Sequence, residues 1–377
     1  MTQPAPGAVW QPGDDPGRRQ FATLNGGGGA GFTLEAGGRL GPVTVAYETW
    51  GSLDASRGNA ILVLHALTGD SHAAGPAGPG HRSPGWWGEI IGPGAPIDTD
   101  RFFVVCPNVL GGCQGTSGPA SPSSDGEPWG SRFPLITIRD QVAVELALTQ
   151  HLGIGQWAAV VGGSMGGMRV LEWCVGHPDR VSRAVVIAVG SAATADQIAL
   201  CSLQIRAIRA DPAYAGADYY RTSARPVTGL AVARGIGQVS YRTADEFEER
   251  FGRGAQRAED PLKGGRYAIE SYLQHHGDKV VERFDPNTYV VLSEAMNHHD
   301  IGRGRGGVDK ALTRVRAAVT VAGIDSDRLY PLGLQADLAR MLPGNPPVEV
   351  IRSSYGHDGF LLEQGRVGEI TAAALNR

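Results

Sequence analysis

The sequence predicts an α/β fold in which helices flank a mostly parallel central sheet, with a helical insertion between two of the strands. Strands buried on both faces are expected at four short, continuously apolar runs: residues 60–64, 102–106, 157–161 and 185–188. Helices are expected between some of these runs, at residues 139–151 and 165–177. This alternation of strand and helix is typical of a parallel sheet covered on both sides.

The chain divides into three parts. Residues 1–30 are rich in proline and glycine, so we expect a loose N-terminal arm. Residues 31–192 and 313–377 carry the strand–helix alternation and are expected to form the catalytic domain. Residues 193–312 are polar and helical in pattern, which indicates an inserted lid.

The second half of the catalytic domain repeats the alternation. Its expected elements are a strand at 317–321, a helix near 332–341, a strand at 348–351 and a last helix from about 359 to 375. An early strand with an alternating pattern is expected at residues 43–49.

Composition excludes several classes of protein. Of 377 residues, 42% are apolar and 19% charged, which permits a large core and excludes wholesale disorder. A net charge of −4 argues against a nucleic-acid partner. No apolar run approaches the roughly 18 residues that cross a bilayer, and no secretory signal is visible. Four cysteines without C-x-x-C spacing make a disulfide framework or a cysteine zinc site unexpected, so a reduced, soluble, cytoplasmic protein is the expectation.

The most specific local motif is Gly162-Gly163-Ser164-Met165-Gly166-Gly167, at the end of one expected strand and the start of a helix. G-x-S-x-G in this context is typical of a nucleophile elbow, a sharp turn that projects a serine hydroxyl above the sheet. The small neighbours Gly162 and Gly166 would let the backbones pass. The alternative is a glycine-rich turn that only packs a helix on a strand.

A nucleophilic serine needs a base and a carboxylate that orients the base. His357 follows the last expected strand, in the position that this chain order requires, whereas His65 precedes the serine. Asp325 and Asp327 both follow the strand at 317–321, and spacing alone does not choose between them.

The oxyanion that forms in acyl transfer needs two amide donors. We expect them from Met165, after the serine, and from Leu67, after the strand at 60–64. The histidine pairs at 275–276 and 298–299 lack a metal-ligand spacing, so no metal is expected.

Seven segments together resemble the homoserine O-acetyltransferase family of α/β-hydrolase-fold enzymes in methionine biosynthesis. They are HALTGDSH at 65–72, NVLGGCQGTSGP at 108–119, GGSMGG at 162–167, YRTADEFEERFGR at 241–253, HHDIGRGRG at 298–306, SDRLYP at 326–331 and YGHDGFL at 355–361. The resemblance implies the triad Ser164, Asp327 and His357. It further implies that Arg234 and Asp358 bind homoserine, as a cation for its carboxylate and an anion for its ammonium.

The resemblance implies transfer of an acetyl group from acetyl-CoA to the homoserine hydroxyl through an acetyl-serine. Acetyl-CoA would be a substrate, with no cofactor, and the partner expected is a second copy of the chain in a homodimer. Three alternatives stay open: a succinyl donor or serine as acceptor on the same fold, a serine esterase, and a non-catalytic protein that has kept the fold.

Overall fold

The computed structural model describes residues 9–29 and 31–377. Its centre is an eight-stranded sheet in the order β1–β4–β8–β5–β9–β10–β11–β12. The strands are β1 (Gln20–Leu24), β4 (Val43–Trp50), β5 (Ala60–Leu64), β8 (Phe103–Pro107), β9 (Ala159–Gly163), β10 (Arg183–Ile187), β11 (Ala318–Ile324) and β12 (Val348–Ile351). β4 pairs antiparallel with both β1 and β8, and every other neighbouring pair is parallel.

Two hydrophobic cores lie on the two faces of this sheet. Side chains alternate along β5, so Leu62 and Leu64 pack in one core while Ile61 and Val63 pack in the other. Helices α1 (Ile138–His151), α2 (Met165–Gly176) and α9 (Leu332–Met341) contribute to the first core, and α11 (Gln364–Leu375) contributes to the second. Burial on both faces explains why these strands are continuously apolar in sequence. Two further ribbons pair β2 (Phe32–Thr33) with β3 (Arg39–Leu40), and β6 (Ile91–Gly92) with β7 (Ile97–Asp98).

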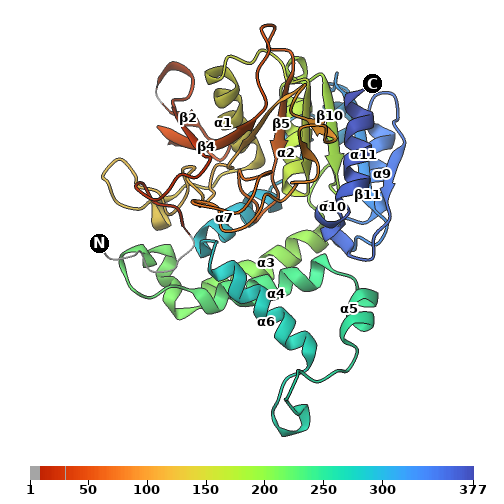
Figure 1. The fold of residues 1–377 in the computed structure, drawn as a ribbon. Coiled ribbons are helices and arrows are strands. Elements are labelled where there is room, and N and C mark those ends of the chain that lie inside the picture. Colours follow the sequence, from red (N-terminus) through yellow and green to blue (C-terminus); the bar gives the residue numbers. More distant parts are fainter. Residues whose placement is uncertain (1–8, 30) are drawn as a thin grey trace.

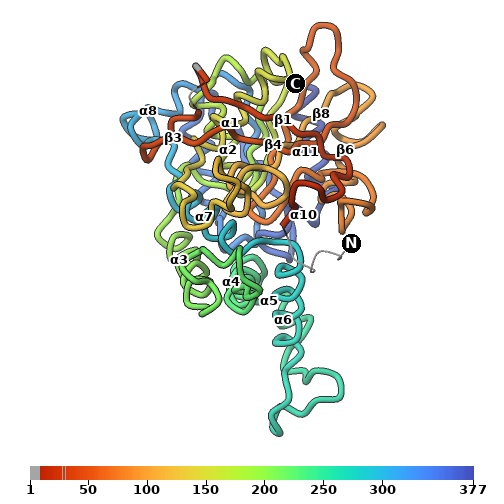
Figure 2. Tube along the Cα trace, turned by 90° about the vertical axis from the view of Figure 1, so that its left-hand side faces the viewer, coloured from red at the N-terminus to blue at the C-terminus, as the bar shows by residue number. Residues whose placement is uncertain are grey.

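The segment between β10 and β11 is helical. It contains α3 (Ala195–Ala210), α4 (Val227–Tyr241), α5 (Ala244–Phe251), α6 (Ala268–Val281), α7 (Pro286–Asn297) and α8 (Val308–Leu312). α4 packs against α3 and α6, and α7 packs against α3 (Figure 1). The turn between α5 and α6 projects away from the body of the molecule (Figure 2). None of the helices among the described residues is both long and apolar enough to cross a bilayer.

Two expectations need correction. Residues 20–24 lie in the region expected to be a loose arm, but they form β1, because Ala22 and Leu24 bury their side chains while the backbone pairs with β4. Residues 1–8 and 30 of that region lie outside the described residues. The last helix is divided into α10 (Gly359–Leu362) and α11. The Trp87 indole donates a hydrogen bond of 3.1 Å to the Phe360 carbonyl, which an uninterrupted helix would use for the Gln364 amide.

A buried ion pair joins α1 and α2 in the first core. The Arg169 guanidinium on α2 is fully buried and donates to Glu145 Oε1 on α1 at 2.6 Å, while Trp173 donates to Glu145 Oε2 at 2.8 Å. Arg169 also donates to the carbonyl of His65, directly after β5. Burial raises the pKa of Glu145, and Arg169 and the hydrogen bonds from Trp173 and Arg169 oppose that shift.

We predict that Glu145→Gln lowers the free energy of unfolding by about 3 kcal/mol or more, because it leaves Arg169 as a buried cation without a counter-charge. Chemical denaturation measures the change. The control is Asp179→Asn, whose partner Arg316 is exposed, and which should cost less than about 1 kcal/mol. Equal effects of the two variants would contradict a structural role for the buried pair.

Candidate active site

Ser164 occupies a strained turn between β9 and α2. Its backbone has φ 55° and ψ −125°, a conformation that a residue with a side chain rarely adopts. The surrounding glycines make the turn possible. A Cβ at Gly162 would lie 2.7 Å from the Gly166 carbonyl carbon, and one at Gly166 would overlap the Leu64 carbonyl oxygen. The turn therefore needs both glycines, as the motif predicts.

The structure brings Ser164, His357 and Asp327 into one hydrogen-bonded chain. His357 Nε2 lies 2.8 Å from Ser164 Oγ, and His357 Nδ1 lies 2.6 Å from Asp327 Oδ2. All three side chains are buried. Since a carboxylate only accepts, Nδ1 carries the proton and Nε2 is left to accept the serine hydroxyl proton.

The loop after β11 decides between the two aspartates. Asp327 Oδ1 accepts the amides of Leu329 and Tyr330, each at 2.8 Å, which turns its second oxygen towards His357. Asp325 instead accepts the Ser353 amide at 3.1 Å. The geometry therefore favours Asp327.

The pKa of His357 is set by opposing effects. Burial lowers it, whereas the charge and hydrogen bond of Asp327 and the charge of Asp358 raise it, and the net pKa lies above the ordinary value. The imidazole becomes the neutral base only above this raised pKa.

The two backbone amides expected to bind the oxyanion have no protein acceptor among the described residues. In the described part of the chain, neither Leu67 nor Met165 donates its amide to a protein acceptor outside its own helix or strand. Met165 is the first residue of α2, so its amide also has no acceptor within the helix. The loop holding Leu67 is fixed by His65, whose Nε2 accepts the Val109 amide at 3.1 Å. Burial lowers the pKa of His65 to about 3, so this histidine stays neutral.

The catalytic cavity, of about 290 Å³, is lined by Ser164, His357, Arg234 and Asp358 among others. The Arg234 guanidinium lies 5.6 Å from the centre of the Tyr241 ring. Asp358 Oδ2 lies 3.6 Å from Nη1 of the buried Arg242. The cavity thus contains a cation and a carboxylate, as a small zwitterion requires.

Sequence reasoning missed three neighbours of this site: Tyr241, Arg242 and Arg283. Tyr241 and Arg283 line the cavity, and Arg242 holds Asp358. Tyr241 and Arg242 open the YRTADEFEERFGR segment, which was a signal for them. Nothing in the local sequence distinguishes Arg283.

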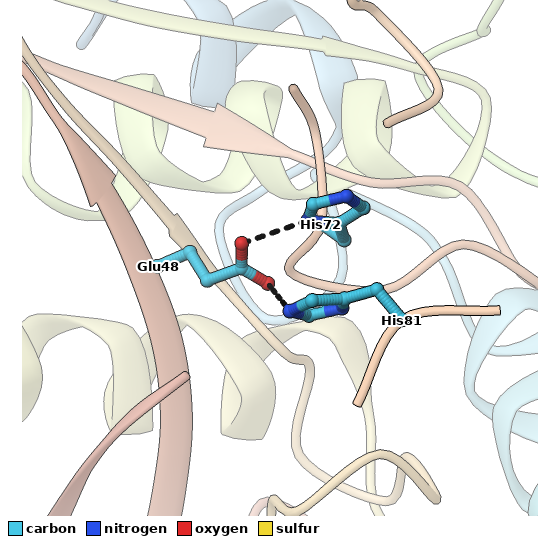
Figure 3. A group of neighbouring side chains, drawn as sticks. All are labelled: Glu48, His72 and His81. Carbon is cyan, nitrogen blue, oxygen red and sulfur yellow. Dashed lines mark hydrogen bonds and ion pairs between the residues drawn. The ribbon is translucent and has the colours of Figure 1, made fainter. Parts of the chain in front are cut away.

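Among the described residues, one group has ligand-type side chains close enough for a metal: Glu48, His72 and His81 (Figure 3). The histidine nitrogens nearest Glu48 are already engaged. His72 donates from Nδ1 to Glu48 at 2.9 Å and from Nε2 to the Pro76 carbonyl at 3.2 Å, so both its ring nitrogens carry protons. His81 Nε2 accepts the Arg18 amide at 3.0 Å.

Burial lowers the pKa of His72, but the hydrogen bond and charge of Glu48 raise it, and the net pKa is raised. The group is therefore a buried ion pair with a second ring stacked 3.8 Å away, rather than a set of open metal ligands.

Comparison with known proteins agrees with the fold and the motifs. Residues 59–363 match the alpha/beta hydrolase fold family. Homoserine O-acetyltransferase of Thermobifida fusca (strain YX) is 58% identical over 97% of this chain and 95% of its own length. The crystal structure of homoserine O-acetyltransferase from Bacillus anthracis superposes with a TM-score of 0.87 at 27% identity, covering 95% of this chain and 97% of that one.

An esterase is also similar. Esterase E22 superposes with a TM-score of 0.85 at 26% identity, over 95% of this chain and 99% of that chain. The fold alone therefore does not distinguish an acetyltransferase from an esterase. The sequence identity to the Thermobifida fusca homoserine O-acetyltransferase, however, is more than twice the identity to esterase E22. By that identity, over nearly its whole length, the chain belongs to the homoserine O-acetyltransferase family of α/β-hydrolase-fold proteins.

Proposed function

We propose that this chain transfers the acetyl group of acetyl-CoA to the hydroxyl of L-homoserine, giving O-acetyl-L-homoserine and CoA for methionine biosynthesis. The observation that carries the proposal is the hydrogen-bonded serine, histidine and aspartate at a cavity that also contains Arg234 and Asp358. Acetyl-CoA acts as a substrate, and no cofactor takes part.

In the first half-reaction, Ser164 Oγ attacks the thioester carbon while His357 Nε2 removes the hydroxyl proton. Asp327 holds the imidazole in the required tautomer and stabilises the imidazolium that forms. The amides of Leu67 and Met165 bind the oxyanion. The tetrahedral intermediate then collapses, CoA leaves as its thiol with the proton from His357, and Ser164 remains acetylated.

In the second half-reaction, the homoserine hydroxyl attacks the acetyl carbon of acetyl-Ser164. His357 removes the hydroxyl proton and returns it to Ser164 Oγ as the product ester forms. Arg234 binds the carboxylate of homoserine and Asp358 binds its ammonium, and Arg242 fixes Asp358. Orientation of the hydroxyl is what favours homoserine over water.

We propose that residues 31–192 and 313–377 form the catalytic domain and that residues 193–312 form a lid that limits water. The lid supplies Gln197, Leu200, Arg234 and Tyr241 to the cavity wall. Narrowing the entrance would lower the rate at which water reaches acetyl-Ser164.

We further propose a cytoplasmic homodimer in which the lid forms the contact. Exposed apolar side chains on α3 and α4 support this: Leu203, Val232 and Val239 are 51%, 52% and 42% exposed. Four buried cysteines without a disulfide fit a reducing compartment.

An esterase is the second candidate, favoured by the similarity to esterase E22. The two functions differ in what consumes acetyl-Ser164. Release of CoA that depends on homoserine supports transfer, and release at the same rate without any acceptor would support hydrolysis.

We predict that Ser164→Ala folds normally and loses turnover by on the order of 10⁴-fold or more, because no covalent intermediate can form. CoA release and the intact mass of the enzyme after exposure to acetyl-CoA measure this. Ser52→Ala, at an exposed site, is the control and should keep both. Retained turnover in the Ser164 variant would refute the covalent mechanism.

We predict that Arg234→Ala lowers kcat/KM for homoserine by about 10- to 100-fold, the effect of losing one charge-assisted hydrogen bond. Acetylation of Ser164 by acetyl-CoA should survive, as single-turnover mass measurements would show. Arg234→Lys keeps the charge and should lose less. An equal loss of Ser164 acetylation would show that Arg234 does not belong to the acceptor site.

We predict that kcat/KM falls on the acid side at a pH above about 6.5, the ordinary pKa of histidine. The active base is neutral His357, and its pKa is raised, so protonation inactivates the enzyme at a higher pH than in free histidine. In Asp327→Asn the acid limb should move to lower pH and the rate should fall by on the order of 10⁴. A wild-type limb below pH 6.5 would contradict the geometry.

A further inference from the structure

A second cavity adjoins the catalytic cavity. It has a volume of about 610 Å³ and shares four lining residues with the catalytic cavity: Gly69, Asp70, Ser83 and Arg283. The catalytic cavity, at about 290 Å³, lies at the lower limit of the roughly 300–1,000 Å³ typical of small-molecule pockets. It can take the acceptor and the thioester end of a donor, but a whole CoA thioester must extend beyond it.

The second cavity is lined by arginines that form no close ion pair among the described residues, although four aspartates also line it. Its lining includes four arginines, none of which forms an ion pair with a carboxylate in the part of the chain that the structure describes: Arg19, Arg82, Arg225 and Arg283. Arg19 uses its guanidinium on the carbonyls of neighbouring loops. Arg82 and Arg283 each donate a single hydrogen bond, to the carbonyls of Glu282 and Thr68.

Most N–H donors of Arg82, Arg225 and Arg283 therefore have no protein acceptor among the described residues. A guanidinium has five such donors in a planar fork that matches the oxygens of a phosphate. Burial together with the charge of Arg234 lowers the pKa of Arg283. An anionic ligand would offset both effects.

The carboxylates of this cavity accept hydrogen bonds from nearby backbone amides. Four aspartates line it, and each accepts a backbone amide two or three residues away: Asp14, Asp15, Asp70 and Asp285. Carboxylates are acceptors only, so side-chain hydrogen bonds to phosphate oxygens would have to come from the arginines. The wall also contains the rings of Trp10 and Tyr220, and a nucleotide base can stack on such aromatic faces.

We infer that the second cavity binds the phosphate-bearing nucleotide end of the acyl donor, with Arg82 and Arg225 on its phosphates and Arg283 at the junction with the catalytic cavity. Acetyl-CoA has its thioester at one end and a diphosphate and a 3′-phosphate at the other, which matches a small reacting cavity beside a larger one that contains arginines with unused donors. This inference rests on the proposed function, because it takes the donor from it.

The test compares two donors, acetyl-CoA and S-acetylpantetheine, which has the same thioester arm but no phosphate. The variant is the double substitution Arg82→Gln and Arg225→Gln, and both residues lie outside the reacting cavity. The control is Arg206→Ala, an exposed arginine on α3 that lines neither cavity. Thermal unfolding checks that all variants fold.

The wild type should prefer acetyl-CoA, and the double variant should lower kcat/KM for acetyl-CoA by about tenfold or more. Its kcat/KM for S-acetylpantetheine and its KM for homoserine should stay unchanged. Raising the salt concentration should raise the wild-type KM for acetyl-CoA more than that of the variant.

An unchanged kcat/KM for acetyl-CoA in the double variant, or an equal loss with both donors, would overturn the inference while leaving acetyl transfer intact. If the wild type transferred acetyl from neither donor to homoserine, the proposed function would be wrong. This inference, which depends on it, would then be wrong as well.

Discussion

The site depends on the strained backbone of Ser164. A φ of 55° at a residue with a side chain costs free energy, and the surrounding packing must hold it in place. Here the amide of Ser164 bonds to the Ile187 carbonyl at 3.0 Å, and the glycines at 162 and 166 let β9, α2 and the end of β5 come into contact. This one turn aims the hydroxyl at His357 and leaves the Met165 amide free, so nucleophile and oxyanion donor share one constraint.

The rest of the site is fixed by polar groups buried on either side of that turn. Arg169 on α2 forms an ion pair with Glu145 and donates a hydrogen bond to the His65 carbonyl. It thereby connects the helix that follows Ser164 with the loop that contains Leu67. Asp327 divides its two oxygens between its own turn and the histidine. Because such buried groups are costly unless satisfied, each network permits essentially one arrangement.

Patterns in the sequence predicted those features of the fold that depend on residues close together in the chain. The apolar runs predicted the buried strands, and the glycine spacing predicted the turn at Ser164. The choice between Asp325 and Asp327 depends on how one loop folds, so spacing left it open and only the resemblance favoured Asp327. Three features depend on partners distant in sequence: the pairing of residues 20–24 with β4, the break between α10 and α11, and the position of Arg283. No pattern within those segments encodes such contacts.

The central claim is transfer of acetyl to homoserine, and the most direct measurement is the rate of CoA release with matched donors and acceptors. Acetyl-CoA and succinyl-CoA are each tested with homoserine, with serine and with no acceptor. The account predicts fast release only for acetyl-CoA with homoserine. Preference for succinyl-CoA or serine would keep the triad but change the substrates, and release that is indifferent to any acceptor would contradict the account.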